Sequence, residues 1–125
     1  MGRVIQMKPE QGLFCVQQHN SKKPHYDLRI EHNGMARSWC MYKPFSITGE
    51  LRLAVKMPPH TVKYLTKEAD DCKIVVLGTC RILSWEENRM KFELNAKTES
   101  GEIVKGCWVL ERTKKGRSFK LYKLN

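Results

Sequence analysis

The sequence lacks long hydrophobic runs and any regular pattern of paired cysteines. Nowhere among its 125 residues do about 18 apolar residues follow one another, and residues 1–8 contain no apolar stretch of the signal-peptide type. The five cysteines form no C-x-x-C pair, and their odd number argues against a disulfide framework. We therefore expect a cytoplasmic protein with reduced, mostly buried thiols and no membrane partner.

Acidic residues are scarce relative to basic ones. The chain has 13 Asp and Glu against 23 Lys and Arg, which gives a formal net charge of +10 at pH 7. A positive field raises the local concentration of polyanions and speeds their encounter, so nucleic acid is the expected partner. A lysine-rich solvated surface without a ligand is the alternative that charge alone leaves open.

A sustained helical hydrophobic period is also missing, since no window keeps an apolar repeat of 3.6 residues for more than about two turns. Short apolar segments bounded by polar turns indicate strands at about 14–18, 25–32, 51–55, 74–76, 90–94 and 103–110. About seven or eight short strands would leave exposed sheet edges unless the sheet closed on itself. We expect a mostly β fold, a single compact closed β-barrel with little helix.

The chain shows no internal repeat, low-complexity segment or interdomain linker, so we expect one domain over residues 1–125. Residues 1–11 are interpreted as a loose N-terminal arm, and residues 114–117 as a mobile basic turn. Either segment is placed to touch nucleic acid, or to remain solvated.

The most informative segment is His25-Tyr26-Asp27-Leu28-Arg29-Ile30. Successive side chains of a strand point to opposite faces. The segment therefore presents His25, Asp27 and Arg29 on one face, while three apolar side chains enter the core on the other. Same-face neighbours lie roughly 6.5–7 Å apart, so the first two can hold one ion while Arg29 reaches a bound oxyanion.

Asn33-Gly34 predicts a two-residue hairpin turn after this strand, because both residues tolerate positive backbone angles. The turn fixes a register in which the facing pairs are His32 with Met35, Arg29 with Ser38, Asp27 with Cys40 and His25 with Tyr42. Ala36, Ser38 and Cys40 are small and leave room for an ion and a ligand beside the polar face, whereas Trp39 and Met41 join the core.

His19 precedes His25 by six residues, across a basic turn that contains Pro24. If that turn brings the imidazole of His19 back over the strand, two imidazoles and the carboxylate of Asp27 converge. Such a set occupies three positions of an octahedral ion and leaves the others open, which suits manganese or iron(II) better than a closed zinc site. The alternative is that both histidines are surface residues and that Asp27 pairs with Arg29 or a lysine.

His60 and Tyr64 form a second candidate group after Pro58-Pro59, where a turn of helix could align both side chains toward a phosphate. In the alternative interpretation, Tyr64 lies at the edge of the core and His60 in a loop. Lys43, before Pro44, is by itself more typical of a solvated lysine than of a ligand.

These residues together resemble the 3'-phosphoesterase domain found in bacterial end-joining DNA ligase D and as free-standing archaeal proteins. The resemblance runs from about Phe14 to Tyr64. Phe14-Cys15-Val16-Gln17-Gln18-His19 is similar to the family's F-V-V-Q-x-H opening, and residues 25–30 to its H-Y-D-x-R-L strand. Ser38-Trp39 with Lys43-Pro44 resembles S-W-x-x-P-K-G, and Leu53-Ala54-Val55 with His60 and Tyr64 resembles L-A-V-x-x-x-x-H-x-x-x-Y.

The resemblance implies a compact β-barrel with Mn²⁺, or another divalent metal, held by His19, His25 and Asp27. It implies that Arg29, His60 and Tyr64 engage the scissile phosphate, with Lys43 nearby in a catalytic role. The family removes a 3'-terminal ribonucleotide from DNA to leave a phosphate, and then removes the phosphate to leave a hydroxyl. The implied partners are DNA 3' ends, such as a primer–template with a 3' ribonucleotide, and a DNA ligase or polymerase that uses the product.

The chain departs from the family pattern in two places. Pro58 stands where the family usually carries an acidic residue two positions before its second histidine, and residues 65–72 replace the glycine-rich I-P-x-G-x-Y-G segment. Both departures leave the metal set intact and bear mainly on the second, phosphomonoesterase step.

Two other functions compete with this one. In a non-catalytic nucleic-acid-binding barrel, Trp39, Tyr42 and Phe45 stack on bases, and binding falls with salt but ignores metal. In an iron(II) oxygenase, His25 and Asp27 bind iron together with a distal histidine, and Arg29 holds an acidic cosubstrate. The proximity of His19 to His25 argues against this arrangement. The broadly basic exterior argues against the oxygenase, because a small organic acid does not need it.

Overall fold

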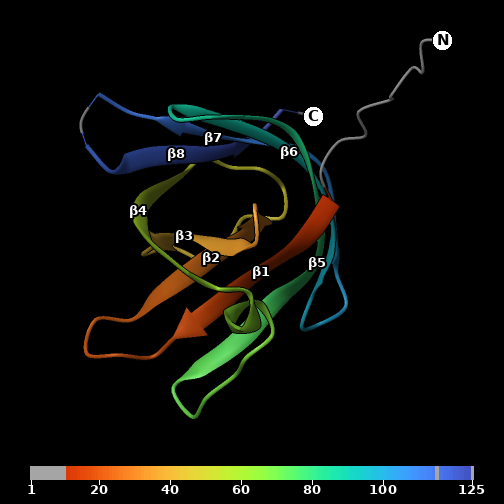
Figure 1. The fold of residues 1–125 in the computed structure, drawn as a ribbon. Helices are drawn as coiled ribbons and strands as arrows, with labels where there is room; N and C mark the ends of the chain where they lie inside the picture. Colours follow the sequence, from red (N-terminus) through yellow and green to blue (C-terminus); the bar gives the residue numbers. More distant parts are fainter. Residues whose placement is uncertain (1–10, 115, 125) are drawn as a thin grey trace, which may run out of the picture.

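A computed structural model describes residues 11–114 and 116–124 and shows eight antiparallel strands and one short 3-10 helix. The strands form a closed barrel in the order β1-β2-β3-β4-β8-β7-β6-β5, in which β5 pairs with β1 (Figure 1). This confirms the predicted β-barrel. The elements are β1 Gln11–His19, β2 His25–His32, β3 Met35–Met41, β4 Arg52–Thr61, η1 Val62–Leu65, β5 Cys72–Glu86, β6 Arg89–Thr98, β7 Ile103–Arg112 and β8 Ser118–Lys123.

The inside of the ring is filled by one side of every strand. Leu28 and Ile30 of β2 and Trp39 and Met41 of β3 are fully buried there, as the alternation predicts. Large aromatic side chains supply most of the apolar area that drives closure. The largest buried rings are those of Trp39, Trp108, Phe14, Phe92 and Phe119.

The β2–β3 hairpin has the predicted turn and three of the four predicted facing pairs. Asn33 and Gly34 have φ angles of 51° and 75°, as a two-residue turn with two positive angles requires. His32 faces Met35, Arg29 faces Ser38 and Asp27 faces Cys40. The local turn therefore determines which side chains of β2 point outward.

The outer face of β1, β2 and β3 is covered in part by η1, which follows β4 and packs on the outside of the ring (Figure 1). Leu65 of η1 is fully buried against Cys15 and Ala36, in an apolar cluster separate from the barrel core. Next to it lie Gln17 and Arg29, two polar side chains that are also buried. This small outer layer shields one region of the outer face from water.

The structure corrects several predicted boundaries. β4 continues through Pro58 and Pro59 to Thr61, so His60 ends a strand and does not share a helical turn with Tyr64 of η1. β5 extends to Glu86, far beyond the predicted 74–76. Gln11 begins β1 and is not part of an arm, while residues 1–10 of that predicted arm lie outside the described residues. In the part of the chain that the structure describes, no helix has the length and apolarity to span a membrane.

Candidate metal centre

The pairing of β1 with β2 brings the predicted metal ligands together. His19 of β1 lies directly opposite His25 of β2, and Gln17 lies opposite Asp27. Residues that face one another in an antiparallel pair point to the same side. The barrel register itself therefore places His19, His25 and Asp27 side by side on the outer face, without a fold-back of the turn between the strands.

The ligand atoms of these three residues all lie within 4.8 Å of one another. His19 Nδ1 is 3.2 Å from His25 Nε2 and 3.6 Å from Asp27 Oδ2, and His25 Nε2 is 3.3 Å from Asp27 Oδ1. Ligands about 2.0–2.2 Å from one ion and at right angles to each other are separated by about 3 Å. The donor set therefore has the spacing that one divalent ion needs.

The remaining ring nitrogens support the same interpretation. His25 Nδ1 lies 3.0 Å from the carbonyl oxygen of Lys23, and His19 Nε2 lies 3.2 Å from Asp71 Oδ2. If each of these nitrogens carries the proton and donates it, the lone pairs of His19 Nδ1 and His25 Nε2 face each other beside a carboxylate. That arrangement is repulsive until a cation occupies it, and hydrogen-bonded histidines of this kind are typical of metal ligands.

Arg29 lies beside the ligand set and has unused donors. Its side chain is buried, and its Nη2 is 3.7 Å from Asp27 Oδ2. Within residues 11–114 and 116–124, its Nε and Nη1 have no hydrogen-bond partner. A buried guanidinium with free N–H groups is costly unless an acceptor completes it, and a phosphate accepts two parallel N–H bonds. Arg29 therefore has the state expected of an oxyanion-binding residue.

A cavity of about 200 Å³ opens next to these donors and is lined by Asp27, Arg29, Tyr64 and Lys67 among others. The Arg29 guanidinium lies 5.5 Å from the centre of the Tyr64 ring, and the Lys67 ammonium lies 5.2 Å from it. Two cations and a phenol thus surround a space that borders the metal ligands. The cavity is suited to a small anion.

His60 reaches this group through Tyr64, since the two ring centres are 5.0 Å apart. Burial lowers the pKa of His60, and the positive charge of Arg29 lowers it further. The imidazole is therefore neutral at pH 7 and has one N–H donor and one acceptor nitrogen. Lys43, in contrast, is exposed and lines a different cavity together with Tyr42 and Arg52.

Three further residues of the site were missed by sequence reasoning. Gln17 donates its amide N–H groups to the carbonyl oxygens of Tyr64 (2.6 Å) and Lys67 (3.2 Å), and so ties η1 and the segment after it to β1. A bulge between Val16 and Gln17 in the β1–β5 pairing lies at this point. Gln17 belongs to the opening motif, so a signal for it existed. Asp71 and Lys67 lie in residues 65–72, where the sequence showed no motif.

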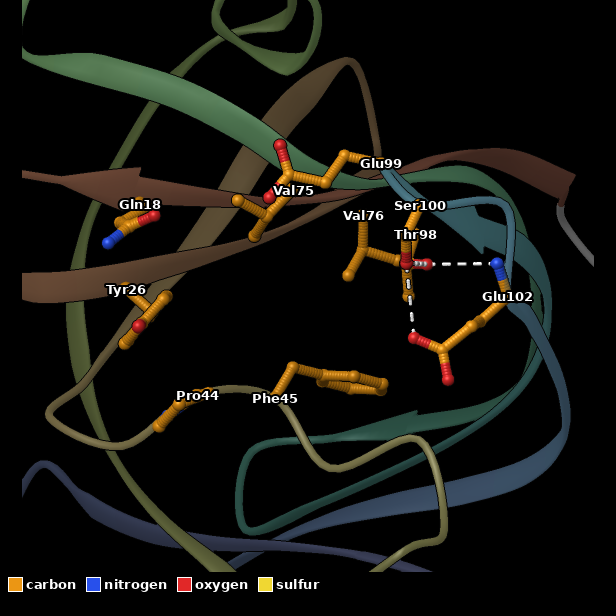
Figure 2. Close-up of a pocket in the computed structure, with 10 residues that line it drawn as sticks. All are labelled: Gln18, Tyr26, Pro44, Phe45, Val75, Val76, Thr98, Glu99, Ser100 and Glu102. Carbon is orange, nitrogen blue, oxygen red and sulfur yellow. Dashed lines mark hydrogen bonds between the residues drawn. The ribbon is translucent and has the colours of Figure 1, made fainter.

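A separate cavity of about 240 Å³ lies on the inner side of the barrel, between Tyr26 and Phe45 on one side and Val75 on the other (Figure 2). Its charged lining residues are Glu99 and Glu102, and no lysine or arginine of the described chain lines it. An acidic cavity repels phosphate, so the outer face is the better candidate for an anionic substrate.

Comparison with known proteins shows which family the chain is similar to. Residues 17–112 match a family described as the DNA ligase D 3'-phosphoesterase domain. The chain is 36% identical over 102 residues to the multifunctional non-homologous end joining DNA repair protein LigD of Mycobacterium tuberculosis (strain CDC 1551 / Oshkosh). The aligned region covers 78% of this chain and 13% of that protein. It is 38% identical over 123 residues to LigD of Pseudomonas aeruginosa, which covers 85% of this chain and 14% of that protein. The match thus spans only about a seventh of those relatives.

Proposed function

The chain belongs to the DNA ligase D 3'-phosphoesterase domain family, and we propose that it trims the 3' ends of DNA with the help of a divalent metal ion, Mn²⁺ in the first instance. Its reaction removes a 3'-terminal ribonucleotide, a 3'-phosphate or both, and leaves an end for repair synthesis or ligation. The observation that carries the proposal is the buried Arg29, whose free donors border both the metal-ligand set and a cavity of about 200 Å³.

The residues fit such a reaction in the following way. His19, His25 and Asp27 would hold the ion, which would lower the pKa of an attacking water and draw charge from the phosphoryl oxygens. Arg29 donates its free N–H groups to the same oxygens as their charge grows. Lys67, in the cavity wall, adds a positive charge.

The neutral imidazole of His60 has a different use. Because its pKa is lowered, it can accept a proton from the attacking group at neutral pH, or donate its N–H to a phosphate oxygen. The ring of Tyr64 lies close to both the His60 imidazole and the Arg29 guanidinium. Its centre is 5.0 Å from the centre of the His60 ring and 5.5 Å from the guanidinium. We propose that Arg29, His60 and Tyr64 together form the phosphate-binding side of the site, and that Lys43 contacts the substrate outside it.

The test follows a labelled primer–template that ends in one 3' ribonucleotide, incubated with the protein and Mn²⁺ or with chelator, against 3'-phosphate and 3'-hydroxyl markers on a sequencing gel. We expect metal-dependent shortening. A product that stops at the phosphate would assign the loss of the second step to Pro58 and the replaced segment. No cleavage, with salt-sensitive binding retained, would favour a non-catalytic nucleic-acid-binding barrel.

Asp27→Asn is the matching variant for this assay, and Asp70→Asn is its control, because Asp70 is exposed and loses the same charge. We expect Asp27→Asn to abolish turnover while DNA affinity stays nearly unchanged. A rate near that of the unaltered protein would refute the assignment of the site.

A further inference from the structure

A second and larger cavity, of about 390 Å³, adjoins the metal ligands on the side away from Arg29. It shares Asp27 with the first cavity but extends from β2 toward β3 and β4, whereas the first extends toward β1 and η1. Its floor follows one row of the outer face, in which Asp27 faces Cys40 and Cys40 faces Val55. A group bound at the ion can therefore continue into either cavity.

The floor and walls of this second cavity differ in chemistry. The floor consists of the buried Cys40 side chain and the apolar Val55 side chain. At the wall, Tyr42 is 54% exposed and presents an aromatic ring to the cavity. The Lys23 ammonium lies 4.5 Å from the centre of that ring, and Arg117 lines the cavity as well.

An exposed ring beside two cations is the combination that proteins use for single-stranded nucleic acid: the base stacks on the ring and the backbone follows the charges. The volume lies near the lower end of the range for small-molecule pockets, roughly 300–1,000 Å³, and so suits about one nucleotide. The ring of His25 lies 6.4 Å from the Tyr42 ring, so the stacking surface begins directly at the metal ligands.

The two cations distinguish between the two sides of the scissile phosphate. A terminal nucleoside that leaves after cleavage carries no further phosphate. Its binding site therefore needs no cation next to the base. The strand that remains continues with a phosphate after every nucleoside. Lys23 and Arg117 therefore match the remaining strand, and their charge would be unused by the leaving group.

We propose that this second cavity binds the last retained nucleotide of the DNA strand, on the 5' side of the scissile phosphate. Its base stacks on Tyr42, and its own 5' phosphate lies against Lys23 and Arg117. The inference rests on the proposed function, since that function defines which phosphate is cleaved. It assigns a polarity to the bound strand that the metal site alone does not.

The test measures binding by fluorescence anisotropy, in chelator so that no cleavage occurs, with a fluorescein-labelled oligodeoxynucleotide that ends in a 3'-phosphate. Stacking on a protein ring contributes roughly 1–3 kcal/mol per base, so Tyr42→Ala should weaken binding by about 5- to 150-fold, and Tyr42→Phe should restore it. Arg117→Ala should lower the slope of log K against log salt by about 0.7. Lys97→Ala, which removes the same charge from an exposed site on β6, should leave both unchanged.

A second probe places an abasic residue at the last retained nucleotide or one position further upstream. If the proposal holds, Tyr42→Ala should have no effect on an oligonucleotide that lacks the last retained base, because the stacking contact is already lost. It should still weaken binding of an oligonucleotide that lacks the base one position upstream. An effect of Tyr42→Ala that appears only when a terminal ribonucleoside follows the phosphate would assign the cavity to the leaving group and overturn the proposal.

These outcomes separate the inference from the proposed function. If the unaltered protein trims 3' ends but Tyr42→Ala binds and cleaves like it, the inference is wrong and the function stands. If Tyr42→Ala weakens binding only when the last base is present, but no condition gives cleavage, the phosphoesterase function is wrong. The cavity then remains a binding site for a DNA 3' end.

Discussion

Substitutions of Asp27 and Asp71 should lower the affinity for the metal ion by different amounts. Both carboxylates contact His19, but only Asp27 contributes an atom to the ligand set, while Asp71 accepts from the far nitrogen of the same imidazole. Loss of such a partner behind a ligand typically costs about 10- to 100-fold in metal affinity. Asp71 is exposed, so Asp71→Asn should lie near the lower end of that range.

Asp27→Asn should cost more than about 100-fold, or more than about 2.8 kcal/mol, because it removes a charged ligand and leaves two neutral imidazoles. Asp70→Asn removes the same charge from the neighbouring exposed position and should change Mn²⁺ affinity little. The three variants therefore report three different effects on metal affinity. Asp27→Asn removes a ligand, Asp71→Asn removes a contact to the ligand His19, and Asp70→Asn removes only a nearby charge.

The assay is titration of each purified variant with Mn²⁺ alone, followed by electron paramagnetic resonance of the free ion. This readout does not depend on turnover or on DNA. Equal affinities for Asp27→Asn and the unaltered protein would refute the metal centre. Equal affinities for Asp71→Asn and Asp70→Asn would show that the contact between Asp71 and His19 does not support the ligand.

Three further predictions concern single side chains. Gln17→Leu leaves the carbonyl oxygens of Tyr64 and Lys67 without their buried donor and should destabilise the fold by about 2 kcal/mol, seen as a lower midpoint in urea unfolding; an unchanged midpoint would contradict this. The lowered pKa of His60 means that the unfolded chain takes up its proton first as pH falls below 6.5. His60 therefore makes the fold lose stability from pH 6.5 downward, and His60→Gln should reduce the fall in Tm between pH 7 and pH 5; parallel curves for the two proteins would refute the shift. Burial raises the pKa of Cys15 to about 12, so iodoacetamide at pH 8 should leave it unmodified in the folded protein and alkylate it after denaturation; mass spectrometry of its peptide decides between the two.

The hairpin at Asn33-Gly34 shows what could be predicted from the sequence. A two-residue turn joins neighbours in the chain, so its type determines the pairing of Arg29 with Ser38 and of Asp27 with Cys40, and both pairs are confirmed. The outward face of β2 follows from that register. Closure of the barrel was also predictable, because many short strands in one small chain leave few other ways to protect their edges.

Contacts between distant parts of the chain could not be predicted in this way. Asp71 lies 52 residues from His19, and the amide of Gln17 binds a carbonyl 47 residues away. Neither follows from periodicity, since each depends on where η1 and the following segment pack. The same holds for His60, which a local helical turn was expected to align with Tyr64 and which instead reaches it from the end of a strand.

The segment that replaces the family's glycine-rich motif explains how the site is completed in this chain. Leu65 closes the apolar layer over β1 and β3, Lys67 lines the cavity beside Arg29, and Asp71 accepts a hydrogen bond from His19. The acidic side chain that the resemblance leads one to expect at position 58, in β4, is absent, but Asp71 of the covering segment 65–72 contacts His19. The carboxylate of Asp71 orients the imidazole of His19. A carboxylate at position 58 would instead lie near His60, on the proposed phosphate-binding side. Since the proposed metal ligands are all retained, we expect any narrowing of activity to concern the choice of phosphate ester and to leave metal affinity intact.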